Sequence, residues 1–461
     1  MSCNLDERTL TEFRDIVGKD GVLSTPTQLM VYEYDASADS HLPDAVVLPR
    51  SAEQVAAVVK VCNREGIPFT ARGAGTNLSG GSVPVMGGVV IVLTRLNRLL
   101  EIDIENQRAV VEPGFLNLEL SSALAPYGYY YAPDPASQKT STLGGNVGEN
   151  AGGPHCLKYG VTTNHVLGME IVLPDGSIVE TGGKPLDLPG YDLTGLFVGS
   201  EGTFGIVTRL TVRIMRLPEA VKTLLAIFET IDDAANTVSD IIAEGILPAT
   251  LEMMDKTVIK AVELAYSSGY PLDAEAVLII ELDGVRDGQD RMAEEIVAIC
   301  QRHRVREVKV AKDQAERDRL WAGRRGAFGA MTKLRPNYIV NDGTVPRTKL
   351  PEVLRKVGEV SRKYDIEIAN VFHAGDGNLH PLVLFSQMDQ DETGRAMASA
   401  RDILEACTEV GGTISGEHGI GLEKKDAMRL VFSDADIRAM RLVKQALDPA
   451  GLCNPMKVLP D

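Results

Sequence analysis

Two histidines flank a tight-turn sequence in FHAGDGNLH (residues 372–380), although the chain of 461 residues has only seven histidines. The segments 366–372 and 379–385 on either side are rich in β-branched and other apolar residues, as strands are, and AGDGN between them consists of turn-forming residues. Residues that flank a tight turn face each other across the two strands, so we expect His373 and His380 to lie together. A pair of neutral histidines is a typical part of a transition-metal site; the alternative is two hydrogen-bonded histidines at the end of a sheet.

A carboxylate and a further histidine adjoin each other in the glycine-rich stretch GGTISGEHGIGLEKK (residues 411–425). Neighbouring residues of an extended segment point to opposite sides. One of Glu417 and His418 could therefore bind a metal while the other faces a substrate.

An arginine pair, Arg324-Arg325, lies within the helix predicted for AERDRLWAGRRGAFGAM (residues 315–331). Trp321 and Arg324 lie three residues apart and so share one helix face. Most arginines on helices are solvated surface charges, and Arg325 is expected to be one. Arginine is also the residue best suited to bidentate pairing with a carboxylate, which makes Arg324 a candidate for substrate binding.

Three segments dense in glycine and small polar residues lie in the N-terminal half: ARGAGTN around residues 73–77, then 133–153 and 199–208. In such turns, backbone N–H groups converge on an anion and small side chains let a pyrophosphate approach. The first segment is not the GxGxxG motif, because Leu78 replaces the third glycine, and no P-loop sequence follows. One such turn could be a plain connection, but three beside β-branched runs predict one large polyanionic ligand.

The surrounding sequence predicts the elements that carry these loops. PRSAEQVAAVVKVCNREG (residues 49–66) predicts a helix that Ser51 caps and Gly66 ends. IPFTAR then predicts a short strand, and the Asp175-Gly176 step marks a hairpin. One face of the helix carries Val55, Val58, Val59 and Cys62.

The pattern of apolar and polar residues changes near Leu217-Pro218. From there, stretches such as KTLLAIFETI and AVLIIELDG alternate with helix-like stretches such as DDAANTVSDIIAEG and GQDRMAEEIVAICQRH. This β-α-β order predicts a sheet covered by helices.

Composition excludes several classes of protein. The net charge of −17, from 47 basic and 64 acidic residues, argues against nucleic-acid binding, which needs basic patches. The N-terminal MSCNLDERTL has no apolar core of a signal peptide, and no run approaches the roughly 20 apolar residues that span a bilayer. The six cysteines are scattered and none forms a CxxC pair, which predicts free thiols in a reducing compartment.

The N-terminal half resembles the FAD-binding domain of the vanillyl-alcohol oxidase superfamily. The resemblance rests on five short sequences in this order: PRSAEQV, ARGAGTN, PDPAS, TLGGN and GSEGTFGIVT. More narrowly, the chain from about residue 45 onward resembles the FAD-linked 2-hydroxyacid oxidases and dehydrogenases, which include glycolate oxidase FAD subunits, D-lactate dehydrogenases and D-2-hydroxyglutarate dehydrogenases. The resemblance implies an α+β fold: a two-part FAD-binding domain of the vanillyl-alcohol oxidase type and an α/β cap domain with a mainly antiparallel sheet. We expect the FAD-binding domain over residues 1–217, the substrate-binding cap with its metal site over 218–420, and a C-terminal segment, 421–461, that returns to the FAD domain.

The resemblance also implies which residues bind FAD. Residues 73–77 would hold the pyrophosphate, residues 143–146 with Asn150 and Gly152 would line the flavin, and Ile206 would lie near the adenine. Some relatives attach FAD to a histidine in the first loop; none occurs there, which implies non-covalent FAD. The full set is Arg72, Gly73, Ala74, Gly75, Thr76, Asn77, Ser79, Gly80, Pro133, Asp134, Thr142, Leu143, Gly144, Gly145, Asn146, Asn150, Gly152, Glu201, Ile206 and Asn454.

In relatives the residues that match His373, His380 and Glu417 bind zinc or another divalent ion. Two histidines and one carboxylate leave coordination positions open, as catalysis requires. The resemblance makes His418 the catalytic base, for which the ordinary histidine pKa near 6.5 is suitable, and makes Arg324 the clamp for the substrate carboxylate. The expected reaction is oxidation of a 2-hydroxy acid to the 2-oxo acid, with hydride transfer from C2 to FAD.

Three positions bear on substrate size. Relatives that act on 2-hydroxyglutarate tend to have a lysine near Val340, an asparagine at Leu382 and a small hydroxyl residue at Phe328. An apolar pocket leaves a second carboxylate unpaired, so we expect glycolate or D-lactate as the substrate. The alternative is that these residues only pack the cap and that Lys333 or Arg347 supplies the distal contact, as a D-2-hydroxyglutarate dehydrogenase would need.

Two other functions fit parts of the pattern. A flavin-free metallohydrolase would use the same histidines and glutamate but would leave the three glycine-rich loops unexplained. A subunit that carries FAD only as structure within an electron-transfer complex would not need His418.

The electron acceptor is expected outside this chain, because no cysteine cluster is present to hold an iron–sulfur centre. By resemblance, electrons would pass to partner subunits or a quinone, and the protein would be cytoplasmic or held at the inner membrane by those subunits. The resemblance also allows a homodimer.

Overall fold

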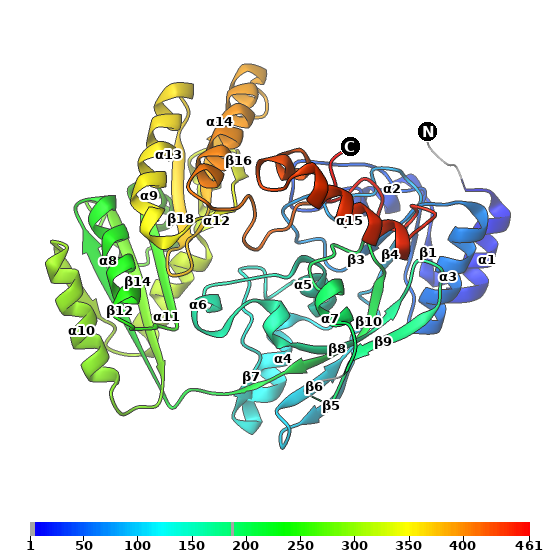
Figure 1. Cartoon of the computed structure of the whole chain (residues 1–461), viewed down its shortest axis with the longest axis horizontal. Coiled ribbons are helices and arrows are strands. Elements are labelled where there is room, and N and C mark those ends of the chain that lie inside the picture. The colour runs from blue at the N-terminus through cyan, green and yellow to red at the C-terminus, as the bar shows by residue number, and fades with distance from the viewer. Residues whose placement is uncertain (1–4, 186–188) are drawn as a thin grey trace. The chain divides into compact units, whose positions relative to one another are not determined.

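The computed structural model describes residues 5–185 and 189–461. The described chain forms two compact units, which are drawn in Figure 1. Unit 1 contains the described residues up to Gly152, then Gly160–Leu217 and Glu417–Asp461; unit 2 contains Gly153–Tyr159 and Pro218–Gly416. The chain thus changes unit at 217/218, where the composition also changes. Two differences from the expected boundaries are the short segment 153–159 and the second change, which falls after Gly416 rather than after residue 420.

A four-stranded sheet opens unit 1, with strand order β1-β2-β4-β3. Its strands are β1 (Val22–Leu23), β2 (Ala45–Val47), β3 (Phe69–Arg72) and β4 (Val89–Val92). Helices α1 (Glu7–Val17) and α3 (Ala52–Glu65) pack on it. The prediction for α3 is confirmed: Ser51 Oγ accepts the N–H of Gln54, Gly66 takes the left-handed conformation at its end, and the predicted apolar face is fully buried in the core.

The second sheet of unit 1 is antiparallel, with strand order β5-β6-β10-β8-β9. Its strands are β5 (Leu99–Asp103), β6 (Arg108–Val111), β8 (Val166–Val172), β9 (Ile178–Gly182) and β10 (Ile206–Arg213). The predicted hairpin at Asp175-Gly176 joins β8 to β9, and Gly176 has a φ of +80° there. The remaining labelled elements of unit 1 are α2 (Pro26–Leu29), α4 (Asn117–Leu124), β7 (Tyr129–Tyr130), α5 (Leu143–Glu149), α7 (Leu193–Phe197), β11 (Met215–Arg216) and α15 (Asp434–Leu447).

Unit 2 is built on a sheet in which every strand pair is antiparallel. Its order is β15-β12-β14-β13-β18-β19-β17, and β20 pairs with both β18 and β16. The strands are β12 (Ala220–Phe228), β13 (Thr250–Asp255), β14 (Ala276–Gly284), β15 (Glu307–Val310), β16 (Asn337–Val340), β17 (Gly343–Thr344), β18 (Ile368–His373), β19 (Asn378–Leu379) and β20 (Pro381–Phe385). The mainly antiparallel cap sheet that the resemblance implied is confirmed.

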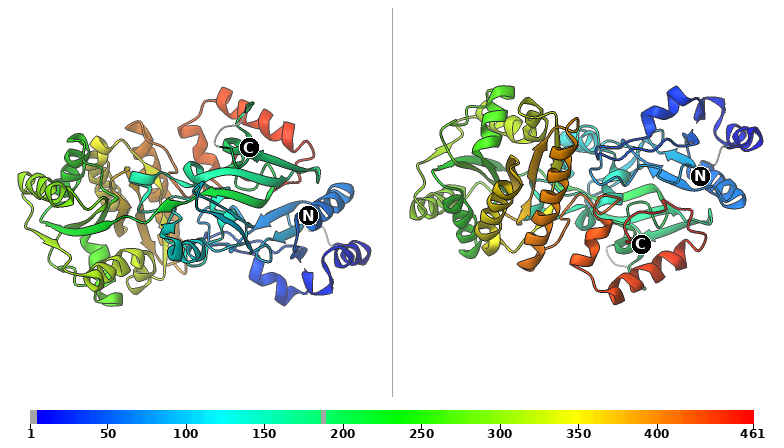
Figure 2. Two further views of the ribbon diagram at one scale, coloured as in Figure 1. Left: turned by 90° about the horizontal axis from the view of Figure 1, so that it is seen from below. Right: turned by 90° about the horizontal axis from the view of Figure 1, so that it is seen from above.

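Helices cover both faces of this sheet, as Figure 2 shows for unit 2. Along β12, Leu224 belongs to one apolar core and Leu225 to the other, because successive strand residues point to opposite faces. The first core lies under α8 (Ile231–Ala243), α10 (Gln289–Arg302), α13 (Leu350–Tyr364) and α14 (Gln390–Glu409). The second lies under α9 (Lys256–Tyr266), α11 (Gln314–Arg325) and α12 (Ala327–Ala330).

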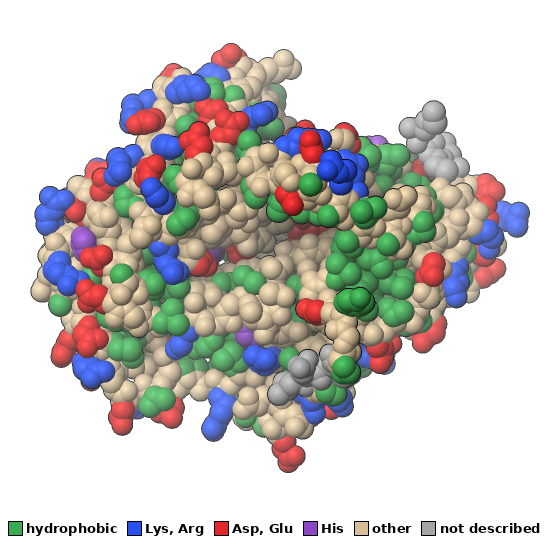
Figure 3. Space-filling view, in the orientation of Figure 1, with side chains coloured by type: hydrophobic (Ala, Val, Ile, Leu, Met, Phe, Trp, Pro, Cys, Tyr) green, Lys and Arg blue, Asp and Glu red, His purple; other side chains and the backbone are tan. Residues whose placement is uncertain are grey.

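The surface of unit 2 carries charges of both signs. In the face shown in Figure 3, acidic and basic side chains are interspersed over α8, α10 and α13. Within the described ranges, no helix combines the length and apolarity that crossing a membrane needs.

Four cysteines are deeply buried thiols: Cys62, Cys300, Cys407 and Cys453. Burial raises the pKa of each thiol, so these groups are protonated and unreactive at neutral pH. Cys3 lies outside the described residues.

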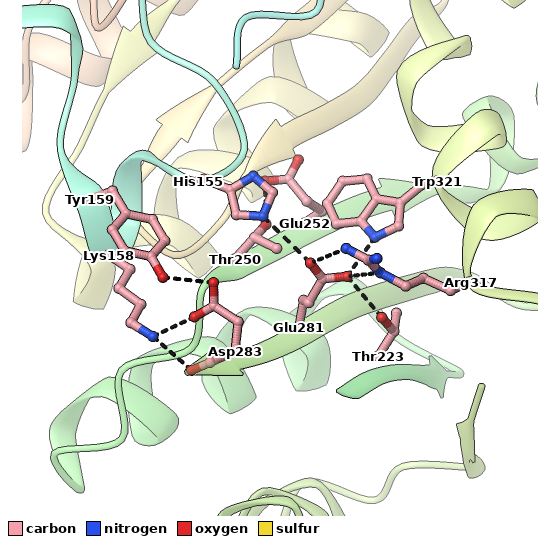
Figure 4. A network of polar contacts seen from close by, with 10 residues as sticks. All are labelled: His155, Lys158, Tyr159, Thr223, Thr250, Glu252, Glu281, Asp283, Arg317 and Trp321. Atoms are coloured by element: carbon pink, nitrogen blue, oxygen red, sulfur yellow. Dashed lines mark hydrogen bonds and ion pairs between the residues drawn. The ribbon is translucent and has the colours of Figure 1, made fainter. Parts of the chain in front are cut away.

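The segment Gly153–Tyr159, which contains the short helix α6 (Cys156–Tyr159), joins unit 2 through polar side chains. Lys158 forms an ion pair with Asp283, and Tyr159 OH donates to the same carboxylate at 2.7 Å. His155 Nε2 lies 3.4 Å from Glu281, and its ring stacks on the ring of Trp321 with 6.0 Å between centroids. Figure 4 shows these contacts on the sheet of unit 2.

Glu281 is the centre of this network. Only 1% of the residue is exposed, yet its carboxylate is surrounded by donors: Arg317 binds both oxygens at 2.9 Å, Trp321 Nε1 donates at 2.7 Å, and Thr223 Oγ1 donates at 2.8 Å. Burial alone would raise the pKa of Glu281, but hydrogen bonds and charges from His155 and Arg317 outweigh it, so the pKa lies below its ordinary value.

We expect Glu281→Gln to lower the free energy of unfolding of unit 2 by about 3 kcal/mol at pH 7, because Arg317 would lose its buried partner charge. A carboxylate whose pKa is depressed by folding stabilises the fold above its unfolded pKa of about 4.3 and loses this contribution as pH falls through the lower folded-state pKa. The difference between variant and wild type should therefore be full at neutral pH and shrink in acid. Urea unfolding followed by the fluorescence of Trp321, the single tryptophan of the chain, measures it.

The matched control is Glu294→Gln on α10, where the glutamate is exposed. This change should leave the free energy of unfolding unchanged. Equal stability of Glu281→Gln and wild type at pH 7 would contradict the argument.

Candidate active site

The histidine pair lies at one end of the unit 2 sheet. His373 ends β18 and His380 directly precedes β20, and their rings meet edge to face with 5.2 Å between centroids. The hairpin therefore brings the two rings together, as the spacing predicts. His380 has none of its surface exposed and His373 has 7%. His373 follows Ala369 and Val371 in the alternation of β18, so it lies on the face that α9, α11 and α12 cover.

Backbone and carboxylate oxygens surround His380 on its Nδ1 side. The carbonyl oxygen of Asn341 lies 3.4 Å from Nδ1, and Asp342 Oδ1 lies 3.7 Å away. Asp342 also accepts the hydroxyl of Ser415 at 2.6 Å and the backbone N–H of Gly416 at 3.0 Å. The oxygens near Nδ1 favour the tautomer of His380 that has its proton on Nδ1 and its lone pair on Nε2.

Glu252 is a functional candidate that the sequence analysis missed. Its carboxylate lies 2.8 and 3.0 Å from His373 Nδ1, and 2.5 Å from the guanidinium of Arg324. Burial alone would raise the pKa of Glu252, but the positive charge of Arg324 and the contact with His373 outweigh it and hold the pKa below its ordinary value. The one sequence feature that could have indicated it is a carboxylate in the middle of TLEMMD, a strand in which every residue is buried.

Arg324 is buried, in contrast to most helical arginines. Only 2% of it is exposed, whereas Arg325 beside it is exposed, as predicted, and lies over the ring of Trp321. The helix predicted for 315–331 is interrupted at Gly326, which separates α11 from α12. Besides its contact with Glu252, the guanidinium has a buried Nε–H with no hydrogen-bond partner among the described residues. A buried donor of this kind is costly unless a ligand pairs with it.

The residues expected to set substrate size differ in their surroundings. Val340 and Leu382 are register partners on β16 and β20 and pack in the core under α9 and α11. Phe328 contacts the site itself, because its ring centroid lies 5.8 Å from that of His380. Lys333 and Arg347 are both exposed.

Glu417 and His418 belong to unit 1, whose last segment begins with them. His418 Nε2 lies 3.7 Å from Glu417 Oε1, so the two side chains approach each other. The prediction that they point in opposite directions is wrong because the chain bends at these residues instead of continuing as a regular extended segment.

The glycine-rich segments of unit 1 converge. A Cβ added at Gly73 would lie 2.2 Å from the hydroxyl of Thr142, so only glycine allows these two loops to touch. The third segment joins them through the N–H of Glu201, which donates to the carbonyl of Gly148 at 2.8 Å. The loops therefore form one assembly, as the sequence predicts for a single ligand.

This assembly has the features of a nucleotide cradle. A Cβ added at Gly148 would meet no heavy atom of the described chain within 4 Å. The buried hydroxyl of Ser141 has no hydrogen-bond partner within the same residues. Open space and a buried polar atom that awaits a partner are what a bound flavin nucleotide would use.

Several predicted FAD-binding residues also connect segments of unit 1. The carboxylate of Glu201 accepts the N–H groups of Ile420 and Gly421 at 2.7 and 2.6 Å, and burial raises its pKa. Asn454 Nδ2 donates to two backbone carbonyls, those of Gly81 and Glu201. Ile206 packs in the core of the first sheet. Arg72 donates to the carbonyl of Tyr34 at 2.7 Å, and its burial lowers its pKa.

The remaining predicted FAD-binding residues lie on the converging loops. Most of them are half-buried or buried, and Gly145 is exposed. The half-buried or buried ones are Ala74, Gly75, Thr76, Asn77, Ser79, Gly80, Pro133, Asp134, Leu143, Gly144, Asn146, Asn150 and Gly152.

A solved structure establishes the class of fold. The structure of p-cresol methylhydroxylase with substrate bound has a TM-score of 0.83 against this chain at 19% identity, and the match covers 100% of this chain and 99% of the other. The fold is that of the vanillyl-alcohol oxidase family, as the sequence motifs predict.

Sequence comparison identifies a narrower family than the fold does. A family model for an FAD binding domain matches residues 43–182, and one for the C-terminal domain of FAD linked oxidases matches residues 217–458. Glycolate oxidase subunit GlcD of Escherichia coli (strain K12) is 47% identical over 440 residues, which are 95% of this chain and 88% of that protein. D-lactate dehydrogenase of Anaerostipes hadrus is 36% identical over 90% of this chain and 89% of its own. The chain belongs to the FAD-linked oxidase family and is an FAD-dependent oxidoreductase, which excludes the flavin-free metallohydrolase.

Proposed function

We propose that this protein oxidises a small 2-hydroxy acid, glycolate or D-lactate, to the 2-oxo acid with non-covalent FAD and the help of a divalent metal. The relatives named glycolate oxidase subunit and D-lactate dehydrogenase support the reaction class, because each aligns with 90% or more of this chain. Both substrates are 2-hydroxy monocarboxylates, which share one carboxylate and one hydroxyl on adjacent carbons.

The observation that carries the proposal is the buried guanidinium of Arg324 beside His373. Its buried Nε–H has no partner within the described residues, and a substrate carboxylate would satisfy it with a charge-assisted hydrogen bond. The contact with Glu252 leaves the Nε side of the guanidinium available. Arg324 would therefore hold the carboxylate and fix which face of C2 is presented for reaction.

The residues of the hairpin fit a divalent metal, because imidazole nitrogens are among the ligands that zinc prefers. We propose His373 and His380 as two ligands and Glu417 as the third. Glu417 directly follows Gly416, whose N–H donates to Asp342, and Asp342 in turn lies 3.7 Å from His380. The metal would bind the substrate hydroxyl and make it more acidic.

His418 would act as general base and take the proton of the substrate hydroxyl. FAD, when bound in unit 1, supplies the acceptor for the hydride that leaves C2. The products of the half-reaction are then the 2-oxo acid, a protonated His418 and the reduced cofactor, so atoms and charge balance.

The test is anaerobic mixing of purified protein with glycolate or D-lactate while the visible flavin spectrum is recorded. We expect the oxidised band to bleach, and we expect chelator-treated protein to lose this reaction and regain it with Zn²⁺. A protein without a flavin band after incubation with FAD would exclude the proposal. Bleaching that is unchanged by chelation, with no metal found by elemental analysis, would remove the metal from it.

Substrate size gives a separate prediction. We expect kcat/KM for glycolate or D-lactate to exceed that for D-2-hydroxyglutarate by at least about tenfold, because an unpaired distal carboxylate is disfavoured in an apolar pocket. Phe328 beside His380 is the structural support for this preference. Steady-state kinetics with an artificial electron acceptor measure it, and a preference for the dicarboxylate would show that another residue pairs with the distal carboxylate.

The electron acceptor is proposed to be a partner subunit or a quinone rather than oxygen. The support is the similarity to a relative that is itself named a subunit. A cytoplasmic position, or attachment to the inner membrane through such subunits, belongs to the same proposal. The rival function is that of a subunit in which FAD is only structural.

A further inference from the structure

Glu252 lies on the strand next to the histidine hairpin. It is in β13, and its register partner on β18 is His373. Directly paired residues of adjacent strands place their side chains on the same face. Only 1% of Glu252 is exposed, so its carboxylate must find its partners inside unit 2.

The carboxylate contacts two of the proposed functional groups at once. His373 Nδ1 lies within 3.0 Å of both oxygens, and an Nη2 of Arg324 lies 2.5 Å from Oε2. Thr250 Oγ1 donates to Oε1 at 3.1 Å from two residues earlier on the strand. Figure 4 shows Thr250 and Glu252 on this strand, beside the network around Glu281.

We propose that Glu252 is a positioning residue that serves the metal site and the substrate clamp together. By accepting the Nδ1–H of His373, it leaves Nε2 as the nitrogen with a lone pair and holds the ring in one orientation. By binding one side of the Arg324 guanidinium, it holds the other N–H groups ready for a carboxylate. This inference rests on the proposed function, because it assigns the support for two residues of that site.

A carboxylate is required for this double role. It is an acceptor at both oxygens, whereas glutamine offers one acceptor and one NH₂ donor. In Glu252→Gln, the NH₂ group would face an N–H of either His373 or Arg324, so at least one of the two contacts would be lost. Aspartate keeps the charge but is one methylene shorter, so it would not reach both partners.

The experiment measures metal affinity apart from turnover. Metal-depleted holoenzyme is titrated with Zn²⁺ by calorimetry, and we expect Glu252→Gln to raise the dissociation constant for Zn²⁺ by about 10- to 100-fold. At saturating Zn²⁺, the KM for the 2-hydroxy acid should also rise, by about tenfold. Glu252→Asp should raise the same two constants, the dissociation constant for Zn²⁺ and the KM, which keeps the test usable if the glutamine variant does not fold.

The matched control is Asp255→Asn on the same strand. Asp255 is also a buried carboxylate and accepts the backbone and side-chain N–H groups of Asn370 on β18, at 2.7 and 2.9 Å. Within the described part of the chain, it forms no hydrogen bond with His373 or Arg324. Its change should leave Zn²⁺ affinity and KM as they are.

Three outcomes decide against the inference. Wild-type Zn²⁺ affinity and KM in both Glu252 variants would overturn it while the proposed function stands. Equal weakening by Asp255→Asn would show that loosening of the strand pair, not the position of Glu252, causes the effect. Failure of the wild-type protein to bind Zn²⁺ would overturn the metal part of the proposed function and the inference with it.

Discussion

His418→Ala is expected to slow reduction of the flavin by the 2-hydroxy acid by about 10²- to 10⁴-fold, the contribution that a positioned general base makes. The substrate hydroxyl must lose its proton as the hydride leaves C2, and no other group is proposed to accept it. Stopped-flow absorbance under anaerobic conditions measures the rate of this single step and is independent of the electron acceptor. Because the change removes only a side chain in a loop, we expect the variant to retain FAD.

Two controls show whether the lost rate belongs to the imidazole. His41→Ala removes an exposed histidine of unit 1 and should leave the rate unchanged. Free imidazole added to His418→Ala should restore part of the rate, which a merely structural role would not predict. A His418→Ala rate equal to that of wild type would exclude this residue as the base and would favour the subunit in which FAD is only structural.

Arg324→Lys is expected to lower kcat/KM by about 10- to 100-fold, with most of the change in KM. Lysine keeps the charge and can remain paired with Glu252, but it lacks the planar fork that binds both oxygens of a carboxylate. The loss corresponds to one charge-assisted hydrogen bond, worth about 1.5–3 kcal/mol. Steady-state kinetics with an artificial acceptor measure it at saturating Zn²⁺.

Arg325→Lys is the matched control, one residue further along the same helix. Arg325 is exposed, and its guanidinium lies over the ring of Trp321 at 5.1 Å, so its replacement should not change kcat/KM. If both variants lose activity to the same extent, the cause is the end of α11 as a whole and not the carboxylate clamp.

Local features of the fold could be predicted because their causes are local. Helix α3 has its cap, its apolar face and its terminal glycine within one stretch of sequence, and all three lie where they were expected. The hairpin that unites His373 and His380 has its turn residues between its strands. In both cases nearby residues determine the backbone, so the sequence pattern is sufficient.

Other features depend on contacts between distant parts of the chain. Glu252 is 121 residues from His373 in sequence, and nothing in TLEMMD indicates which strand will pair with it. Helix propensity favoured one helix over 315–331, but it is interrupted at Gly326. The bend at Glu417 and His418 is a loop conformation, and period-two alternation holds only for regular strands.

The segment Gly153–Tyr159 also bears on how such a gene could be divided or recombined. It precedes Pro218 in the chain, yet it supplies Lys158 and Tyr159 to Asp283 in the sheet of unit 2. A fragment expressed from Pro218 onward would lack these partners and leave a carboxylate without its counter-charge. Exchange of caps between related enzymes should therefore succeed more often when this heptapeptide is exchanged together with the cap. The coding sequence for a complete cap is thus discontinuous in the gene.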